Sequence, residues 1–100
     1  MRYLTFNFGE GADGVTTIEA MASTTAAAHA AVMVEVQQVL DWAWQSYPHT
    51  HGCADDGADW DHDVQVNVED SRWHAVTLTL TASTPFLEDF LVEFRDSLDE

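Results

Sequence analysis

The sequence has no lysine and only three arginines, which are Arg2, Arg72 and Arg95. Its 18 aspartate and glutamate residues give a formal net charge of -15 over 100 residues. Proteins that bind DNA or RNA through phosphate contacts need clustered lysine and arginine side chains. An anionic membrane surface attracts clusters of the same kind. The charge balance therefore excludes direct nucleic-acid binding and adsorption to an anionic membrane.

Cysteine and long apolar runs are scarce as well. The single cysteine, Cys53, excludes an internal disulfide framework. No apolar run approaches the roughly 20 residues that span a membrane, and polar residues interrupt the first apolar stretch, unlike in a signal peptide. We therefore expect a cytoplasmic protein. Hydrophobic residues still make up 46% of the chain, which is enough to form the core of a folded domain.

Four segments alternate apolar and polar residues, a period of two that is typical of half-buried strands. They cover residues 2–8, 15–22, 64–69 and 76–81. Glycines at three of the six positions in 9–14 predict a hairpin loop between the first two strands. In the third strand we expect the inward side chains to be Val64, Val66 and Val68.

Helical spacing of apolar residues predicts two helices, the first over about 25–47. Ser23 or Thr24 is its expected cap. Its apolar stripe comprises Val32, Val36, Val39, Leu40, Ala43 and Tyr47. Glu35 lies on the opposite, polar side, and Val34 and Trp42 fall outside the stripe.

Thr84 is the expected cap of the second helix, with Pro85 at the first helical position. Its apolar stripe comprises Leu87, Phe90, Leu91, Phe94 and Leu98.

The order strand, strand, helix occurs twice, and the halves align at an offset of about 60 residues. Ala22-Ser23-Thr24 matches Ala82-Ser83-Thr84 at that offset. Common descent and common folding rules both explain the match. We predict an α+β two-layer sandwich in which a four-stranded, mostly antiparallel sheet carries two helices on one face, in ββαββα order. One domain then covers residues 1–100, as two strand–strand–helix units over about 1–47 and 63–100 joined by an acidic loop over about 48–62.

The loop after the first helix is the strongest candidate for a metal site. His49, His51 and Cys53 would point to one side of an extended backbone, and Asp55 would complete a tetrahedral set of ligands for zinc or copper. The spacing matches no common zinc motif. The alternative is that this loop, which also contains Asp59, Asp61 and His62, is acidic, solvated and free of metal.

No motif in the sequence predicts catalysis or a cofactor. The aspartates around Cys53 disfavour its thiolate, which is the reactive form. The glycines at 9–14 join two strands and do not open a helix, so they form no phosphate-binding loop. Two further histidines, His29 and His74, are expected at the edge of the core, and a pH switch is the alternative reading. We expect a protein without enzymatic activity.

Tryptophan among carboxylates suggests a surface for a basic protein partner, because indole rings and carboxylates both attract cations. The candidate partner-binding residues are Trp42, Trp60 and Trp73. We predict an interaction or regulatory module, with a homodimer as one form of that interaction. The alternatives are a metal-binding protein and a salt-adapted protein whose acidity reports its environment alone.

Overall fold

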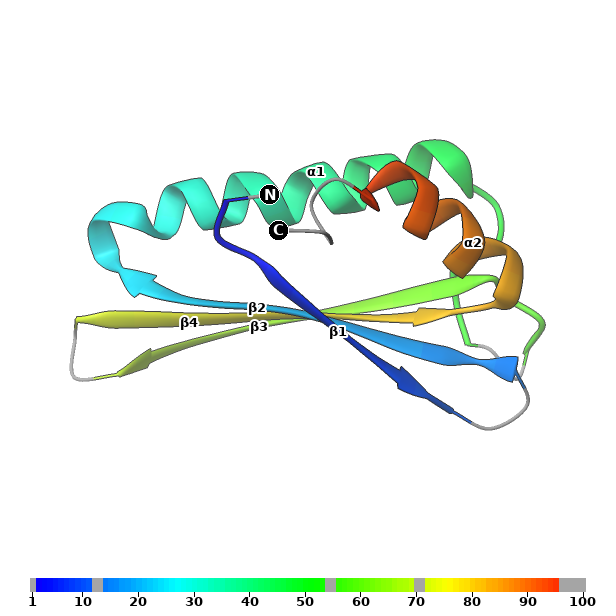
Figure 1. Ribbon diagram of the computed structural model, residues 1–100, viewed down its shortest axis with the longest axis horizontal. Coiled ribbons are helices and arrows are strands. Elements are labelled where there is room, and N and C mark those ends of the chain that lie inside the picture. Colours follow the sequence, from blue (N-terminus) through cyan, green and yellow to red (C-terminus); the bar gives the residue numbers. More distant parts are fainter. Residues whose placement is uncertain (1, 12–13, 54–55, 70–71, 96–100) are drawn as a thin grey trace.

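Four antiparallel strands form a single sheet in the order β1-β2-β4-β3 in the computed structural model, which describes residues 2–11, 14–53, 56–69 and 72–95. The chain runs through β1 (Thr5–Glu10), β2 (Thr16–Thr25), α1 (Ala26–Ser46), β3 (Trp60–Glu69), β4 (Trp73–Ala82) and α2 (Thr84–Glu93). Both helices cover the same face of the sheet (Figure 1). The predicted α+β sandwich with ββαββα order is therefore confirmed.

The core lies between the two helices and the central strands β2 and β4. Alternate residues of these strands point toward the helices, and Ile18, Ala20, Leu78 and Leu80 are almost completely buried. The apolar stripe of α1 covers them as predicted, through Val32, Val36, Val39, Leu40 and Ala43. The other rows of β2 and β4 face away from the helices and include Thr17, Glu19, Thr77, Thr79 and Thr81.

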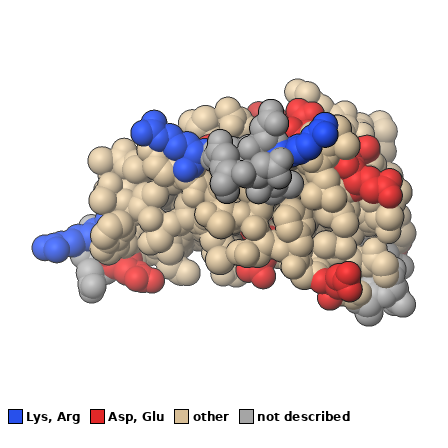
Figure 2. Space-filling model, viewed as in Figure 1, with Lys and Arg blue, Asp and Glu red and all other residues tan. Residues whose placement is uncertain are grey.

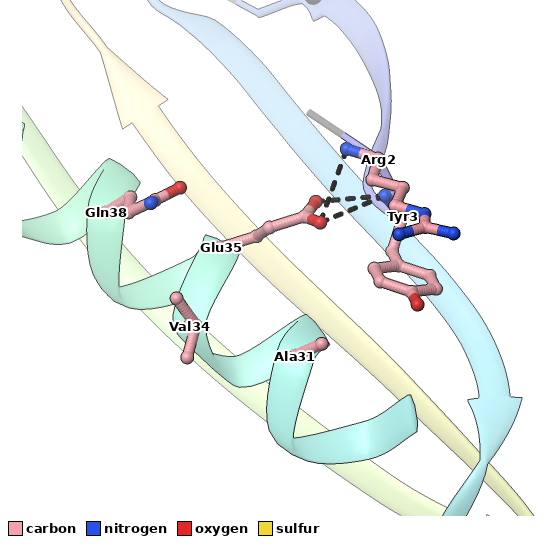
Figure 3. Close-up of a pocket in the computed structure, with 6 residues that line it drawn as sticks. All are labelled: Arg2, Tyr3, Ala31, Val34, Glu35 and Gln38. Carbon is pink, nitrogen blue, oxygen red and sulfur yellow. Dashed lines mark hydrogen bonds between the residues drawn. The ribbon is translucent and has the colours of Figure 1, made fainter. Parts of the chain in front are cut away.

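Glu35 is buried, contrary to the prediction that it faces water from the polar side of α1. Only 8% of its surface is exposed. Its carboxylate accepts hydrogen bonds from the backbone N–H groups of Tyr3 and Leu4 at 3.0–3.1 Å, and from that of Arg2 at 3.3 Å. Figure 3 shows this side chain reaching from α1 to the chain segment that precedes β1. These hydrogen bonds hold the segment there, because they replace the water that a buried carboxylate loses.

The second helix buries Phe90 and Phe94 as predicted and Leu87 in part, but it also buries Phe86 and leaves Leu91 exposed. Phe86 and Phe90 are fully buried and Phe94 is nearly so, whereas Leu91 is 39% exposed. Leu98 lies outside the described residues. These phenylalanines contact Trp42, whose ring centroid lies 5.3–5.9 Å from theirs. Trp42 falls outside the stripe of α1 because it packs against α2.

The helix caps also differ from the prediction. Thr25 caps α1 without a side-chain hydrogen bond, because β2 continues through Ser23 and Thr24. Ser83, not Thr84, caps α2, and its hydroxyl accepts a hydrogen bond from the N–H of Phe86 at 3.3 Å.

The two halves of the chain share one architecture but keep no constant offset. In the central pair, Glu19 lies opposite Thr79, sixty residues later. In the first hairpin, Phe6 pairs with Ala20. The counterpart of Ala20, sixty residues later, is Leu80, and it pairs with His62. His62 follows Phe6 by 56 residues, so the outer strands are not offset by sixty. A gapless repeat therefore describes the central strands and not the outer ones.

Candidate functional site

Strand β3 forms one edge of the sheet, and most of it is uncovered. It pairs with β4 on one side, and no other described strand pairs with it. The loop before it makes a single parallel bridge, between His51 and Trp60, with a hydrogen bond of 2.9 Å from the N–H of Gly52 to the carbonyl of Trp60. Beyond that point the outer edge of β3 has backbone groups available for another extended chain.

The side chains of β3 form two chemically different rows. The row on the helix side contains Val64, Val66 and Val68, and the opposite row contains Asp61, Asp63, Gln65, Asn67 and Glu69. The valines were predicted to be buried, and that prediction was wrong for two of them. Val66 is 43% exposed and Val68 is 56% exposed. They point to the expected side, but α1 lies over β2 and β4 and leaves the edge strand open.

The charged row has carboxylates and no cation along the strand. Asp63 lies opposite Thr79 on β4, and Glu69 lies opposite Trp73. Within the described parts of the chain, the ion pair that involves this row joins Asp61 to His51 at 3.0 Å. Figure 2 shows the side of the molecule opposite β3, where β1 is nearest the viewer; there the arginines lie apart from one another, and acidic side chains occur along the sheet and at one end. The edge thus presents negative charge and half-exposed valines on alternate residues.

The same row disfavours pairing of β3 with a second copy of itself. An antiparallel pair centred on Val66 would place Asp63 opposite Glu69, and one centred on Gln65 would place Asp61 opposite Glu69. Like charges that face each other directly across two strands are destabilising. A partner with the opposite charge meets no such penalty.

The structure places the three predicted partner-binding tryptophans in different environments. Trp60 is 1% exposed and its Nε1–H donates to the carbonyl of Tyr47 at 2.9 Å, so it is not available as a contact. Trp42 is partly buried against α2. Trp73 is 46% exposed and pairs with Glu69 at the end of β3. Of the three, Trp73 is the exposed one, and it lies on β4, one strand inward from the uncovered edge.

The predicted metal ligands are not brought together as a set. His49 and Cys53 are exposed in the loop, and Asp55 lies outside the described residues. His51 instead approaches Asp61 and His62, which belong to the first residues of β3. Both residues were predicted to lie in the loop, because the third strand was expected to begin at Val64. The alternation that continues back to Trp60 was the available signal.

His29 and His74 form a second histidine pair, at the other end of the sheet. Their ring centroids lie 4.6 Å apart, and the Nδ1 atom of each ring is buried without a hydrogen-bond partner among the described residues. Both side chains are partly buried, as expected for the edge of the core.

Comparisons of the chain with protein-family models, with curated proteins and with solved structures found no match. No helix in the described ranges is both long and apolar enough to cross a membrane.

Proposed function

We propose that this protein is a non-enzymatic interaction module that binds a basic, extended segment of a partner protein along the outer edge of β3. One observation carries the proposal, namely the alternation along that edge of half-exposed valines and carboxylate or amide side chains. A partner strand with apolar and basic residues on alternate positions would match both rows. Its backbone would use the unpaired hydrogen-bonding groups of β3, as in other cases of strand addition to a sheet.

The expected affinity is modest. Each exposed ion pair contributes about 0.2–1 kcal/mol, so the contacts to Asp63 and Glu69 supply only part of the binding energy. Backbone hydrogen bonds and contacts with Val66 and Val68 would supply the rest. We expect a dissociation constant of about 10–100 µM for a single strand. An affinity in this range is suited to a reversible regulatory contact.

Trp73 lies on β4 across from Glu69, at the far end of the charged row. Because it lies opposite Glu69, a lysine or arginine of the partner placed there would contact a carboxylate and an exposed indole ring together. A cation over an exposed tryptophan gains about 0.5–1 kcal/mol. Trp73 would therefore favour a basic residue at one end of the bound segment.

Binding of a synthetic peptide of the length of β3, with valine and lysine alternating, tests the proposal. Isothermal titration calorimetry should show that the peptide binds, and that a peptide of the same composition with valines and lysines in two blocks binds at least about fivefold more weakly. A peptide with valine and glutamate alternating should not bind. Equal affinity for the alternating and block peptides would contradict the proposal, because attraction by net charge alone does not depend on residue order.

Two charge-reversal variants distinguish binding of the peptide at the β3 edge from binding elsewhere on the acidic surface. Asp63→Lys should lower the affinity for the alternating peptide about 5- to 30-fold, because one attractive contact becomes repulsive. Glu93→Lys changes the net charge equally on α2, where Glu93 is exposed, and should have a much smaller effect. Equal losses in both variants would show that binding does not take place at β3.

The proposed setting is the cytoplasm, which suits an exposed free thiol at Cys53.

Adaptation to high salt is the alternative explanation of the acidic surface. In that case the free energy of unfolding should rise steeply with salt, since salt screens repulsion among the carboxylates, and both lysine peptides should bind equally weakly.

A further inference from the structure

Three ligand-type atoms converge where the loop after α1 meets the first residues of β3. The Nε2 atom of His51 lies 2.8 Å from Nδ1 of His62 and 3.0 Å from Oδ1 of Asp61. All three atoms lie within 4.8 Å of one another, and all three residues are partly buried. Consecutive residues of a strand point to opposite faces, so Asp61 and His62 can meet only at the edge of the sheet. His51 reaches both because its bridge with Trp60 places it at that edge.

These distances are close to those that a tetrahedral metal ion requires. Zinc binds imidazole nitrogen and carboxylate oxygen at about 2.0–2.2 Å, which places two ligand atoms of a tetrahedron about 3.3 Å apart. The observed separations of 2.8 and 3.0 Å need to increase by only a few tenths of an ångström. Two imidazoles and one carboxylate suit Zn²⁺ and its neighbours, whereas Ca²⁺ and Mg²⁺ take sets of oxygen ligands.

The surroundings hold the three side chains in place without an ion. The backbone N–H of His62 donates to Oδ1 of Asp61 at 2.8 Å, which fixes the carboxylate. The ring of His51 packs against both Trp44 and Trp60, with centroid distances of 4.6 and 4.5 Å. The next residue, Gly52, has a φ of +150°, which side-chain-bearing residues rarely adopt. The loop is therefore held so that His51 points toward β3.

We propose that His51, Asp61 and His62 form a binding site for a divalent transition-metal ion of the Zn²⁺ type, with a coordination position left for water or a partner group. The inference does not depend on the peptide-binding proposal, since it involves different atoms and a different ligand. Three protein ligands with one open position is an arrangement that zinc adopts in proteins. Bound metal would fasten the loop to the start of β3.

Calorimetric titration of the protein with Zn²⁺ alone tests the site. His51→Gln, Asp61→Asn and His62→Gln should each weaken Zn²⁺ binding at least about tenfold. His49→Gln and Cys53→Ser change two exposed residues of the same loop and should leave the affinity unchanged. Circular dichroism of each variant establishes that it is folded. Unchanged affinity in all three site variants would overturn the proposal, as would an equal loss in the His49 and Cys53 variants.

Substitution of Co²⁺ for Zn²⁺ provides a second readout that does not depend on any variant. The proposed nitrogen and oxygen ligands predict visible absorption bands of tetrahedral Co²⁺ without a thiolate charge-transfer band. A thiolate band would assign the metal to Cys53 and overturn the proposal. Absorption typical of Co²⁺ surrounded by water alone would likewise contradict it.

Discussion

The backbone N–H of Leu4 donates a hydrogen bond of 3.1 Å to the carboxylate of Glu35, thirty-one residues later in the chain. This contact, with those from Tyr3 and Arg2, fixes the start of the chain against α1 before it enters β1. Sequence patterning places Glu35 on the solvent side of α1. In the structure it instead links this helix to the segment that precedes β1.

Replacement of Glu35 by glutamine should lower the free energy of unfolding by about 1–3 kcal/mol, because hydrogen bonds to a charged group become bonds to one neutral oxygen. The amide –NH₂ of glutamine would also face backbone donors. Urea denaturation measures the change. Glu19→Gln, at an exposed position on β2, is the matched control and should alter stability by less than about 0.5 kcal/mol. Equal effects of the two substitutions would show that the Glu35 contacts contribute no net stability.

The hydroxyl of Tyr47 donates to Oδ2 of Asp89 at 2.5 Å, which links the end of α1 to α2. Burial, this hydrogen bond and nearby carboxylates raise the pKa of Tyr47 to about 12. The pKa in the unfolded chain is about 10, so the folded state retains the proton more strongly. The resulting stabilisation is complete below pH 10 and is lost as the pH rises through 12, at no more than about 1.4 kcal/mol per pH unit.

Unfolding of the wild type and of Tyr47→Phe between pH 8 and about 12 measures that loss. The two stability curves should run parallel below pH 10 and converge above it. Wild-type and Tyr47→Phe curves that stay parallel to pH 12 would contradict the raised pKa.

Substitution by alanine should mainly lower stability at Trp42 and mainly weaken peptide binding at Trp73. Trp42→Ala removes contacts with Phe86, Phe90 and Phe94 and should lower the free energy of unfolding by about 2–4 kcal/mol. Trp73→Ala should cost less than about 1 kcal/mol, since the side chain is half exposed, and should weaken binding of the alternating peptide two- to fivefold. Denaturation and calorimetry on the same samples measure both effects. A larger stability loss in the Trp73 variant would reverse the assigned roles.

The side chain that caps α2 should contribute more to stability than the one that caps α1. The hydroxyl of Ser83 accepts from the N–H of Phe86 and donates to Oδ1 of Asp59 at 2.8 Å. Ser83→Ala should therefore lower stability by about 1 kcal/mol. Thr25 caps α1 without a side-chain hydrogen bond, so Thr25→Ala should change stability by less than about 0.5 kcal/mol. Thermal unfolding that ranks the two variants in the opposite order would contradict this assignment of the caps.

The fold was predictable from sequence because alternation and helical spacing are local signals. The apolar stripe of α1 and the rows of β2 and β4 lie where those patterns place them. The patterns do not state what covers each face. Glu35, Trp42 and Val66 were misjudged because their environments depend on the N-terminal segment, on α2, and on the distance of β3 from α1.

Only parts of the candidate sites were predictable. His51 was chosen from the loop composition, but its neighbours Asp61 and His62 became apparent only when the start of β3 and the bridge to Trp60 were known. Spacing along a loop cannot reveal ligands that come together across a strand edge. Trp73 was chosen for its chemistry, and its place beside Glu69 depends on the register of the hairpin.

Hydrogen exchange of the backbone amides, measured by NMR with and without the alternating valine–lysine peptide, tests the proposed role of β3 most directly. We predict that alternate amides between Val64 and Glu69 gain protection, because a strand added at the edge pairs with every second residue. Amides of β1, the opposite edge, should not change. Protection on β1 or on the helices, or no protection of β3 at peptide concentrations that saturate binding, would contradict it.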